Sequence, residues 1–202
     1  MRDKSPKRPA SGFDRREFLR GSGAAAAATA LHGGVLRGEE NGVKVEGRDA
    51  KSISLNVNGA DHKVMAEPRT TLMEALRYQL QLTGAKPVDV EGNCGGSTVL
   101  IDGKPASAAN TLAVECVGKK VQTVESLGGA KPDAVVTAFA NNDAMQCGFC
   151  TPGFVVAVKA FLTKNPKATE EQVRSGLNGN LCRCGTYANV IQAALEVVKG
   201  GK

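Results

Sequence analysis

The chain has 202 residues, 42% of them apolar and 23% charged, which is enough for one ordinary domain or two small ones. Its formal charge is +6, but the first twenty residues carry seven Lys or Arg against three Asp or Glu and so supply four of those charges. The remainder is nearly balanced and has no basic stripe with interleaved aromatic residues, which argues against a nucleic-acid-binding protein.

Residues 1–30 have the layout of an export signal. The pair Arg15-Arg16 precedes a weakly apolar run at 21–31, and Ala28-Thr29-Ala30 supplies a small-x-small cleavage site. This order resembles a twin-arginine signal, which implies export of the folded protein to the periplasm. The alternatives are a chance Arg-Arg pair in a basic tail and an alanine-rich helix. The run is too short and too rich in alanine to be a stable membrane span.

The next segment predicts a hairpin followed by a helix. Residues 31–51 are polar and rich in glycine, and we interpret them as a tether. Apolar and polar residues then alternate over residues 53–66 around Asn58-Gly59, which is a strong hairpin signal. Thr71-x-x-Glu74 is a capping box, and leucine recurs every four residues after it, so we expect a helix from Thr71 to Leu82.

Further short strands complete a small sheet domain. A glycine-rich loop over residues 84–97 leads into a strand at 98–104 with an Asp102-Gly103 turn. Two more strands are expected at residues 111–117 and 121–125. Residues 52–128 are therefore predicted to form an α+β domain.

After residue 132 the pattern becomes helical. Asp133 and Thr186 are predicted helix caps, Thr151-Pro152 gives a cap and a first-turn proline, and Thr169-x-x-Gln172 is a second capping box. The expected helices cover residues 134–143, 152–162, 170–177 and 187–199. Four helices in residues 133–199 predict a compact bundle.

Two cysteine pairs stand just ahead of predicted helix N-termini. They are Cys147-x-x-Cys150 and Cys182-x-Cys184. Unpaired backbone N–H groups and the helix dipole favour thiolate at such positions, so the four sulfurs can hold a metal centre. The spacing alone fits an iron–sulfur cluster and a zinc site equally, although zinc sites more often use two C-x-x-C turns. Disulfides are a third option in an exported protein.

From about Ser52 to Val198 the chain resembles the iron–sulfur subunit of the molybdenum hydroxylases, the xanthine oxidase and aldehyde oxidoreductase family. The resemblance is carried by Q-C-G-F-C-T-P-G at 146–153, T-E-E-Q-V-R at 169–174 and G-N-L-C-R-C-G-T-Y at 179–187. L-N-V-N-G, L-T-G-A-K and T-V-L-I-D-G-K-P agree in the sheet domain. The resemblance implies a β-grasp ferredoxin-like domain followed by a four-helix bundle with a [2Fe–2S] cluster on Cys147, Cys150, Cys182 and Cys184.

The family also carries a second, plant-type cluster, and here the chain departs from the pattern. The four matching positions are Asp89, Cys94, Ser97 and Ala109. One thiolate among four positions is a poor match to iron–sulfide chemistry, so we expect this second cluster to be absent. Cys116 lies beyond the loop and is expected to pack as a small apolar residue. The alternatives are a cluster that recruits Cys116 and a Cys94–Cys116 disulfide formed after export.

The resemblance implies an electron-transfer subunit in an exported complex. A large partner subunit would bear molybdopterin and oxidise an aldehyde or an N-heterocycle, and Gln146 and Cys184 match the positions that contact the pterin. A flavin subunit with FAD is one acceptor, and a cytochrome is another because the second cluster is expected to be missing. A docking and export module without redox activity is the alternative of a different class, and a zinc-bound structural subunit is a third. No catalytic residue is expected in this chain.

Overall fold

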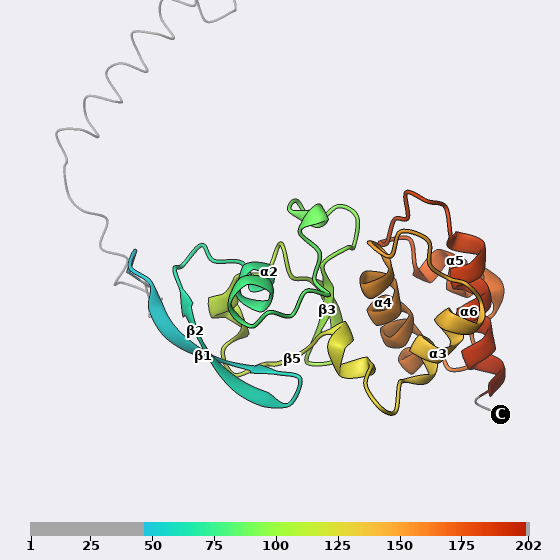
Figure 1. Ribbon diagram of the computed structural model, residues 1–202, viewed down its shortest axis with the longest axis horizontal. Coiled ribbons are helices and arrows are strands. Elements are labelled where there is room, and N and C mark those ends of the chain that lie inside the picture. Colours follow the sequence, from blue (N-terminus) through green and yellow to red (C-terminus); the bar gives the residue numbers. More distant parts are fainter. Residues whose placement is uncertain (1–46, 201–202) are drawn as a thin grey trace, which may run out of the picture. The chain divides into compact units, whose positions relative to one another are not determined.

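A mixed sheet comes first along the chain, and four longer helices follow it (Figure 1). The computed structural model describes residues 47–200, which belong to one compact unit. The predicted export signal at 1–30 and the predicted tether up to residue 46 lie outside the described residues. The α+β class expected from the sequence is confirmed.

The sheet has five strands in the order β2-β1-β5-β3-β4. Their bounds are β1 Lys51–Val57, β2 Ala60–Ala66, β3 Thr98–Ile101, β4 Lys104–Ser107 and β5 Lys120–Gln122. β1 pairs antiparallel with β2 and parallel with β5, and β3 pairs antiparallel with β4 and β5. Asn58 and Gly59 form the β1–β2 turn with φ of 54° and 85°, which confirms the predicted hairpin.

The helix predicted from Thr71 to Leu82 begins as expected but ends early. α2 covers Leu72–Glu74 and has both hydrogen bonds of the capping box at Thr71. The chain then widens into a π-helical turn over Ala75–Gln79. Gln81 has a φ of 58°, which no right-handed helix accommodates, so the helix stops before Leu82.

The strand predicted at residues 111–117 is wrong. Leu112 makes a single bridge to Thr71, and Ala113–Cys116 form a 3₁₀ turn. Ala113 and Cys116 are both buried, and side chains three residues apart point the same way in a 3₁₀ turn. The strand predicted at 121–125 is shorter than expected, because a second 3₁₀ turn begins at Val124.

The helical half contains α3 Ala134–Asn141, α4 Thr151–Lys164, α5 Glu170–Gly176 and α6 Tyr187–Gly200. Asp133 caps α3 and Thr169 forms the capping box of α5, as predicted. The prediction that Thr151 caps α4 is wrong, because Cys150 occupies the N-cap position and Thr151 lies inside the helix. The Thr151 hydroxyl is buried and has no hydrogen-bond partner among residues 47–200.

The sheet lies between two apolar layers. Val99 packs with the residues of α2 and with Val121, whereas Leu100, its neighbour on β3, packs with Val156 and Ala160 of α4. This alternation is expected of a strand buried on both faces. α4 therefore joins the sheet to the helical half, as Figure 1 shows beside β3. Within the described residues, no helix has the length and apolar character needed to cross a membrane.

Candidate metal centre

The two cysteine turns are interleaved. Cys147 and Cys150 lie between α3 and α4, and Cys182 and Cys184 lie between α5 and α6. The Cys184 thiol is close enough to that of Cys147 to shift its pKa, and the Cys182 thiol acts in the same way on Cys150. Each pair thus takes one sulfur from each turn. Within residues 47–200, no three His, Cys, Asp or Glu side chains gather as a group that could hold a metal ion.

The inner pair consists of Cys182, which is buried, and Cys150, which is half-buried. Burial, the hydrogen bond with Cys182 and the nearby sulfur charges raise the pKa of Cys150 to about 12. Burial also opposes ionisation of Cys182, but hydrogen bonds from the Thr186 hydroxyl and N–H and from Cys150 outweigh it and lower its pKa to about 7. Within the inner pair, Cys182 is therefore the sulfur that ionises more readily.

The outer pair, Cys147 and Cys184, is exposed. The backbone N–H of Phe149 and the Cys184 thiol lower the pKa of Cys147. A backbone hydrogen bond from Cys147 lowers the pKa of Cys184, but the Cys147 thiol and the nearby sulfur charges outweigh it and raise that pKa. The pKa is thus lowered at the first cysteine of each turn and raised at the second, which lies nearer the start of the following helix. The expected effect of the helix N-terminus is outweighed at Cys150 by burial and by the neighbouring sulfurs.

Two neighbours of Cys182 contribute to the site in ways that the sequence analysis missed. The Thr186 Oγ1 lies 3.2 Å from the Cys182 Sγ, and the Thr186 N–H lies 3.5 Å from it, so this predicted cap also supports a sulfur. The Tyr187 hydroxyl accepts a hydrogen bond of 2.8 Å from the Cys182 N–H. Its ring meets Phe154 edge-on, with 6.1 Å between ring centroids. Both residues lie in the quoted run at 179–187, which was the available signal.

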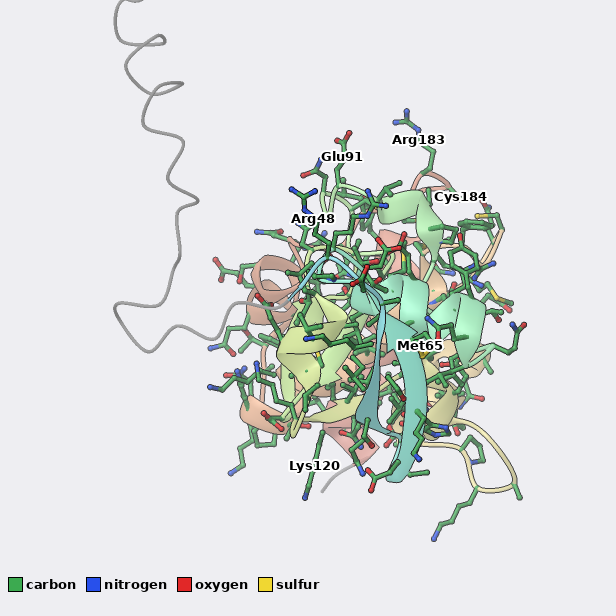
Figure 2. All side chains as sticks on the ribbon, turned by 90° about the vertical axis from the view of Figure 1, so that its left-hand side faces the viewer. Arg48, Met65, Glu91, Lys120, Arg183 and Cys184 are labelled. Carbon is green, nitrogen blue, oxygen red and sulfur yellow. The ribbon has the colours of Figure 1, made fainter. Side chains whose placement is uncertain are left out.

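The exposed side of the site is apolar. Met145, Phe149 and Leu181 are exposed large apolar residues around the two turns. The ammonium group of Lys86 lies 5.6 Å from the centre of the Phe149 ring. Figure 2 shows Arg183 pointing outward at the same end of the molecule as Cys184. Gln146, the other predicted pterin-contact residue, is exposed as well, so this face is open to a partner.

The predicted positions of the second cluster differ in their chemistry from the four C-terminal cysteines. Ser97 is fully buried, and its Oγ lies 3.2 Å from the Ser107 Oγ and accepts a hydrogen bond of 3.3 Å from the Ala109 N–H. Ala109 offers no ligand atom, and Asp89 is the last residue of a 3₁₀ turn. Internal hydrogen bonds thus engage the serine that replaces a ligand, and these residues do not fit a plant-type cluster.

The two remaining cysteines lie in different surroundings. Cys94 lines a cavity of about 410 Å³ together with Cys150 and Cys182. Cys116 is fully buried in the core of the sheet half, where burial raises the pKa of its thiol. Its expected packing as a small apolar residue is confirmed.

Comparison with known proteins extends these observations. Residues 123–195 match the model of the [2Fe-2S] binding domain, and residues 12–32 match that of the TAT (twin-arginine translocation) pathway signal sequence. The chain is 38% identical to the xanthine dehydrogenase iron-sulfur-binding subunit of Escherichia coli O157:H7, over 73% of this chain and 94% of that protein. It is 33% identical to the aldehyde oxidoreductase iron-sulfur-binding subunit PaoA of the same organism, over 92% and 88% respectively.

Among solved structures, quinoline 2-oxidoreductase from Pseudomonas putida 86 is similar with a TM-score of 0.72 and 39% identity, over 75% of this chain and 96% of the matched chain. The agreement covers both the sheet and the helical half, because 75% of this chain exceeds the length of either. The chain therefore belongs to the iron–sulfur subunits of the molybdenum hydroxylases, the xanthine dehydrogenase and aldehyde oxidoreductase family, and is an oxidoreductase subunit with a [2Fe–2S]-binding domain and a twin-arginine signal.

Proposed function

We propose that the chain is the electron-transfer [2Fe–2S] subunit of an exported molybdenum hydroxylase complex. The observation that carries the proposal is the match of residues 123–195 to the [2Fe-2S] binding domain, within which the four thiols influence one another in pairs that join one turn to the other. Such a set supports a centre bound by both turns rather than by one. Cys147, Cys150, Cys182 and Cys184 would be its ligands.

The surroundings of the sulfurs fit this group. A [2Fe–2S] cluster accepts and releases single electrons at a potential set by net charge, hydrogen bonds to sulfur and solvent exposure. The chain supplies N–H donors from Phe149 and Thr186 and a hydroxyl from Thr186. These donors stabilise negative charge on the thiolates and hold the sulfurs in place.

One cluster per chain is part of the proposal. The β-grasp domain would extend over residues 52–128 and the four-helix [2Fe–2S]-binding bundle over residues 133–199. The hydrogen-bonded Ser97 and the apolar Ala109 support the view that the positions of the second cluster are empty. Electrons would then leave by another acceptor, such as a cytochrome, or pass to a flavin subunit with FAD by a longer and slower route.

The partner would be a large subunit with a molybdopterin cofactor that oxidises an aldehyde or an N-heterocycle. Relatives are named for aldehydes, xanthine and nicotine, and a similar structure is named for quinoline, which supports this substrate class. The large subunit would cover the exposed Met145 and Phe149, and Gln146 and Cys184 would contact the pterin. The twin-arginine signal supports a periplasmic complex.

The test is reduction of the centre by substrate in the purified native complex. The oxidised complex is mixed without oxygen with an aromatic aldehyde or with quinoline, and visible absorption and electron paramagnetic resonance (EPR) are followed. We expect the [2Fe–2S] signal of the reduced cluster to appear within one turnover. The signal should be lost in Cys184→Ala and kept in the control Cys116→Ala. A centre that stays oxidised during turnover would contradict electron transfer, and a colourless zinc protein would contradict the cluster.

A further inference from the structure

We propose that the glycine-rich loop over residues 92–97 holds the two cysteine turns at their mutual spacing, with Asn180 as the positioning residue. The inference rests on the proposed function, because the turns are those proposed to bind the cluster. The inference assigns a structural role to a loop that contains two of the four positions matching the second cluster, Cys94 and Ser97, of which only Cys94 has a thiol. Cys94 and Gly95 contact the segments directly after the first turn and directly before the second.

The loop is fastened to the chain directly before Cys182. The Asn180 Nδ2 donates a hydrogen bond of 3.0 Å to the Gly95 carbonyl, and the Leu181 N–H donates one of 2.9 Å to the Cys94 carbonyl. Asn180 is only 8% exposed, so its amide has little access to water as an alternative partner. Buried hydrogen bonds of this kind are costly to break, and these two fix the backbone that leads into the second turn.

The same loop touches the helix that follows the first turn. Gly153 lies three residues after Cys150, in the first turn of α4. A Cβ at position 153 would lie 2.1 Å from the Gly95 carbonyl oxygen, which no real contact permits. A Cβ at Gly95 would in turn lie 2.6 Å from the Gly179 carbonyl oxygen, and Gly95 has a φ of +72°. Glycine is required on both sides of this approach.

The Gly95 peptide therefore lies between the two cysteine-bearing segments. Within the sheet half, the Thr98 Oγ1 also donates a hydrogen bond of 2.8 Å to the Gly95 carbonyl oxygen. Because close-packed interiors transmit small displacements, a shift at this carbonyl would move Asn180 and with it Cys182, two residues further along. The spacing of the Cys150 and Cys182 sulfurs should thus depend on a loop in the sheet half.

The test compares two isosteric substitutions in the full-length protein with its metal. Asn180→Asp places a carboxylate oxygen opposite the Gly95 carbonyl. Asn165→Asp is the control, because its Nδ2 donates to the Phe161 carbonyl at the same distance of 3.0 Å, but from an exposed side chain at the C-terminal end of α4. The measurements are EPR g-values, midpoint potential, the rate of iron loss to a chelator and the melting temperature.

We expect Asn180→Asp to change the g-values, to shift the potential and to release iron several-fold faster than the wild type. Asn165→Asp should lower the melting temperature and leave the other three at wild-type values. Thr98→Val keeps Asn180 and removes the hydroxyl that donates to the Gly95 carbonyl. It should change the g-values, potential and iron release in the same direction as Asn180→Asp, and it replaces Asn180→Asp as the test if that variant does not fold. Wild-type g-values, potential and iron release in both Asn180→Asp and Thr98→Val would overturn the inference.

A second readout separates this inference from the proposed function. Dibromobimane, which bridges two nearby thiols, is added to the metal-free proteins. Bridging between the two turns should be several-fold slower in Asn180→Asp than in Asn165→Asp, and equal rates would contradict the positioning role. A wild-type protein that lacks any [2Fe–2S] signal would contradict the proposed function, whatever the bridging rates.

Discussion

Tyr187→Phe tests the support of the second cysteine turn most cleanly. The substitution removes the hydroxyl that accepts the Cys182 N–H at 2.8 Å and keeps the ring that meets Phe154 edge-on. It leaves the N–H of a buried residue without its acceptor. The chain has two tyrosines, and the other one, Tyr78, is exposed, so Tyr78→Phe is a natural control.

The free-energy cost of Tyr187→Phe depends on how buried Cys182 and Tyr187 are. An unsatisfied buried donor costs about 1–3 kcal/mol. Cys182 is buried, but Tyr187 is 39% exposed, so water can reach the vacated position. We therefore expect the low end of the range, about 1 kcal/mol. That free energy corresponds to a melting temperature lower by about 2–4 °C and to roughly fivefold faster loss of iron through local opening of the turn.

The assay follows the decay of visible absorption after a chelator is added to the holoprotein, with thermal unfolding measured in parallel. Tyr187→Phe should lose iron faster than the wild type, and Tyr78→Phe should match the wild type in both measurements. Equal rates of iron loss in the two variants would refute the view that the Tyr187 hydroxyl holds the turn.

Two other predictions concern stability. Burial alone would raise the pKa of Asp133, but hydrogen bonds from Lys159 and from the Val135 N–H outweigh it and lower that pKa. The Asp133 carboxylate therefore stabilises the fold fully above a pH of about 4, the ordinary pKa of aspartate in the unfolded chain. This contribution is lost as the pH falls through the lowered pKa of the folded state. Asp133→Asn should keep the helix cap and remove this pH dependence from urea unfolding, whereas Asp133→Ala should also lose about 1–2 kcal/mol of capping energy; an unchanged pH profile in both would contradict the assignment. Cys116→Ser should have a free energy of unfolding about 1–3 kcal/mol lower than that of Cys116→Ala, because the serine hydroxyl would lack a hydrogen-bond partner in the sheet core. Equal free energies of unfolding in the two variants would show that water reaches this position.

Local signals in the sequence predicted local structure well. The Asn58-Gly59 turn and the capping boxes at Thr71 and Thr169 are present because each depends on residues within three or four positions. The prediction of a strand through Cys116 failed because alternation over a few residues does not distinguish a strand from a 3₁₀ turn. Thr151 failed as a cap because the preceding Cys150 continues the helical backbone.

The arrangement of the site needed contacts that are distant in the sequence. The four cysteines could be assigned to two turns, but their spacing does not say that Cys147 meets Cys184 and Cys150 meets Cys182. The hydrogen bond between the Asn180 amide and the Gly95 carbonyl joins the helical half to the sheet half. The Asn180–Gly95 hydrogen bond accompanies the packing of α4 against β3, and the cysteine pairings depend on how the helices pack together, neither of which a short motif encodes.

The central claim is a single [2Fe–2S] cluster on the four C-terminal cysteines. Its most direct test is the iron content and the low-temperature EPR spectrum of the native complex after reduction with dithionite. We predict two irons for each copy of this chain and one [2Fe–2S] signal, which Cys94→Ala leaves in place and Cys182→Ala removes. Four irons with two distinct signals, or a signal that survives Cys182→Ala unchanged, would contradict a single cluster on the C-terminal cysteines.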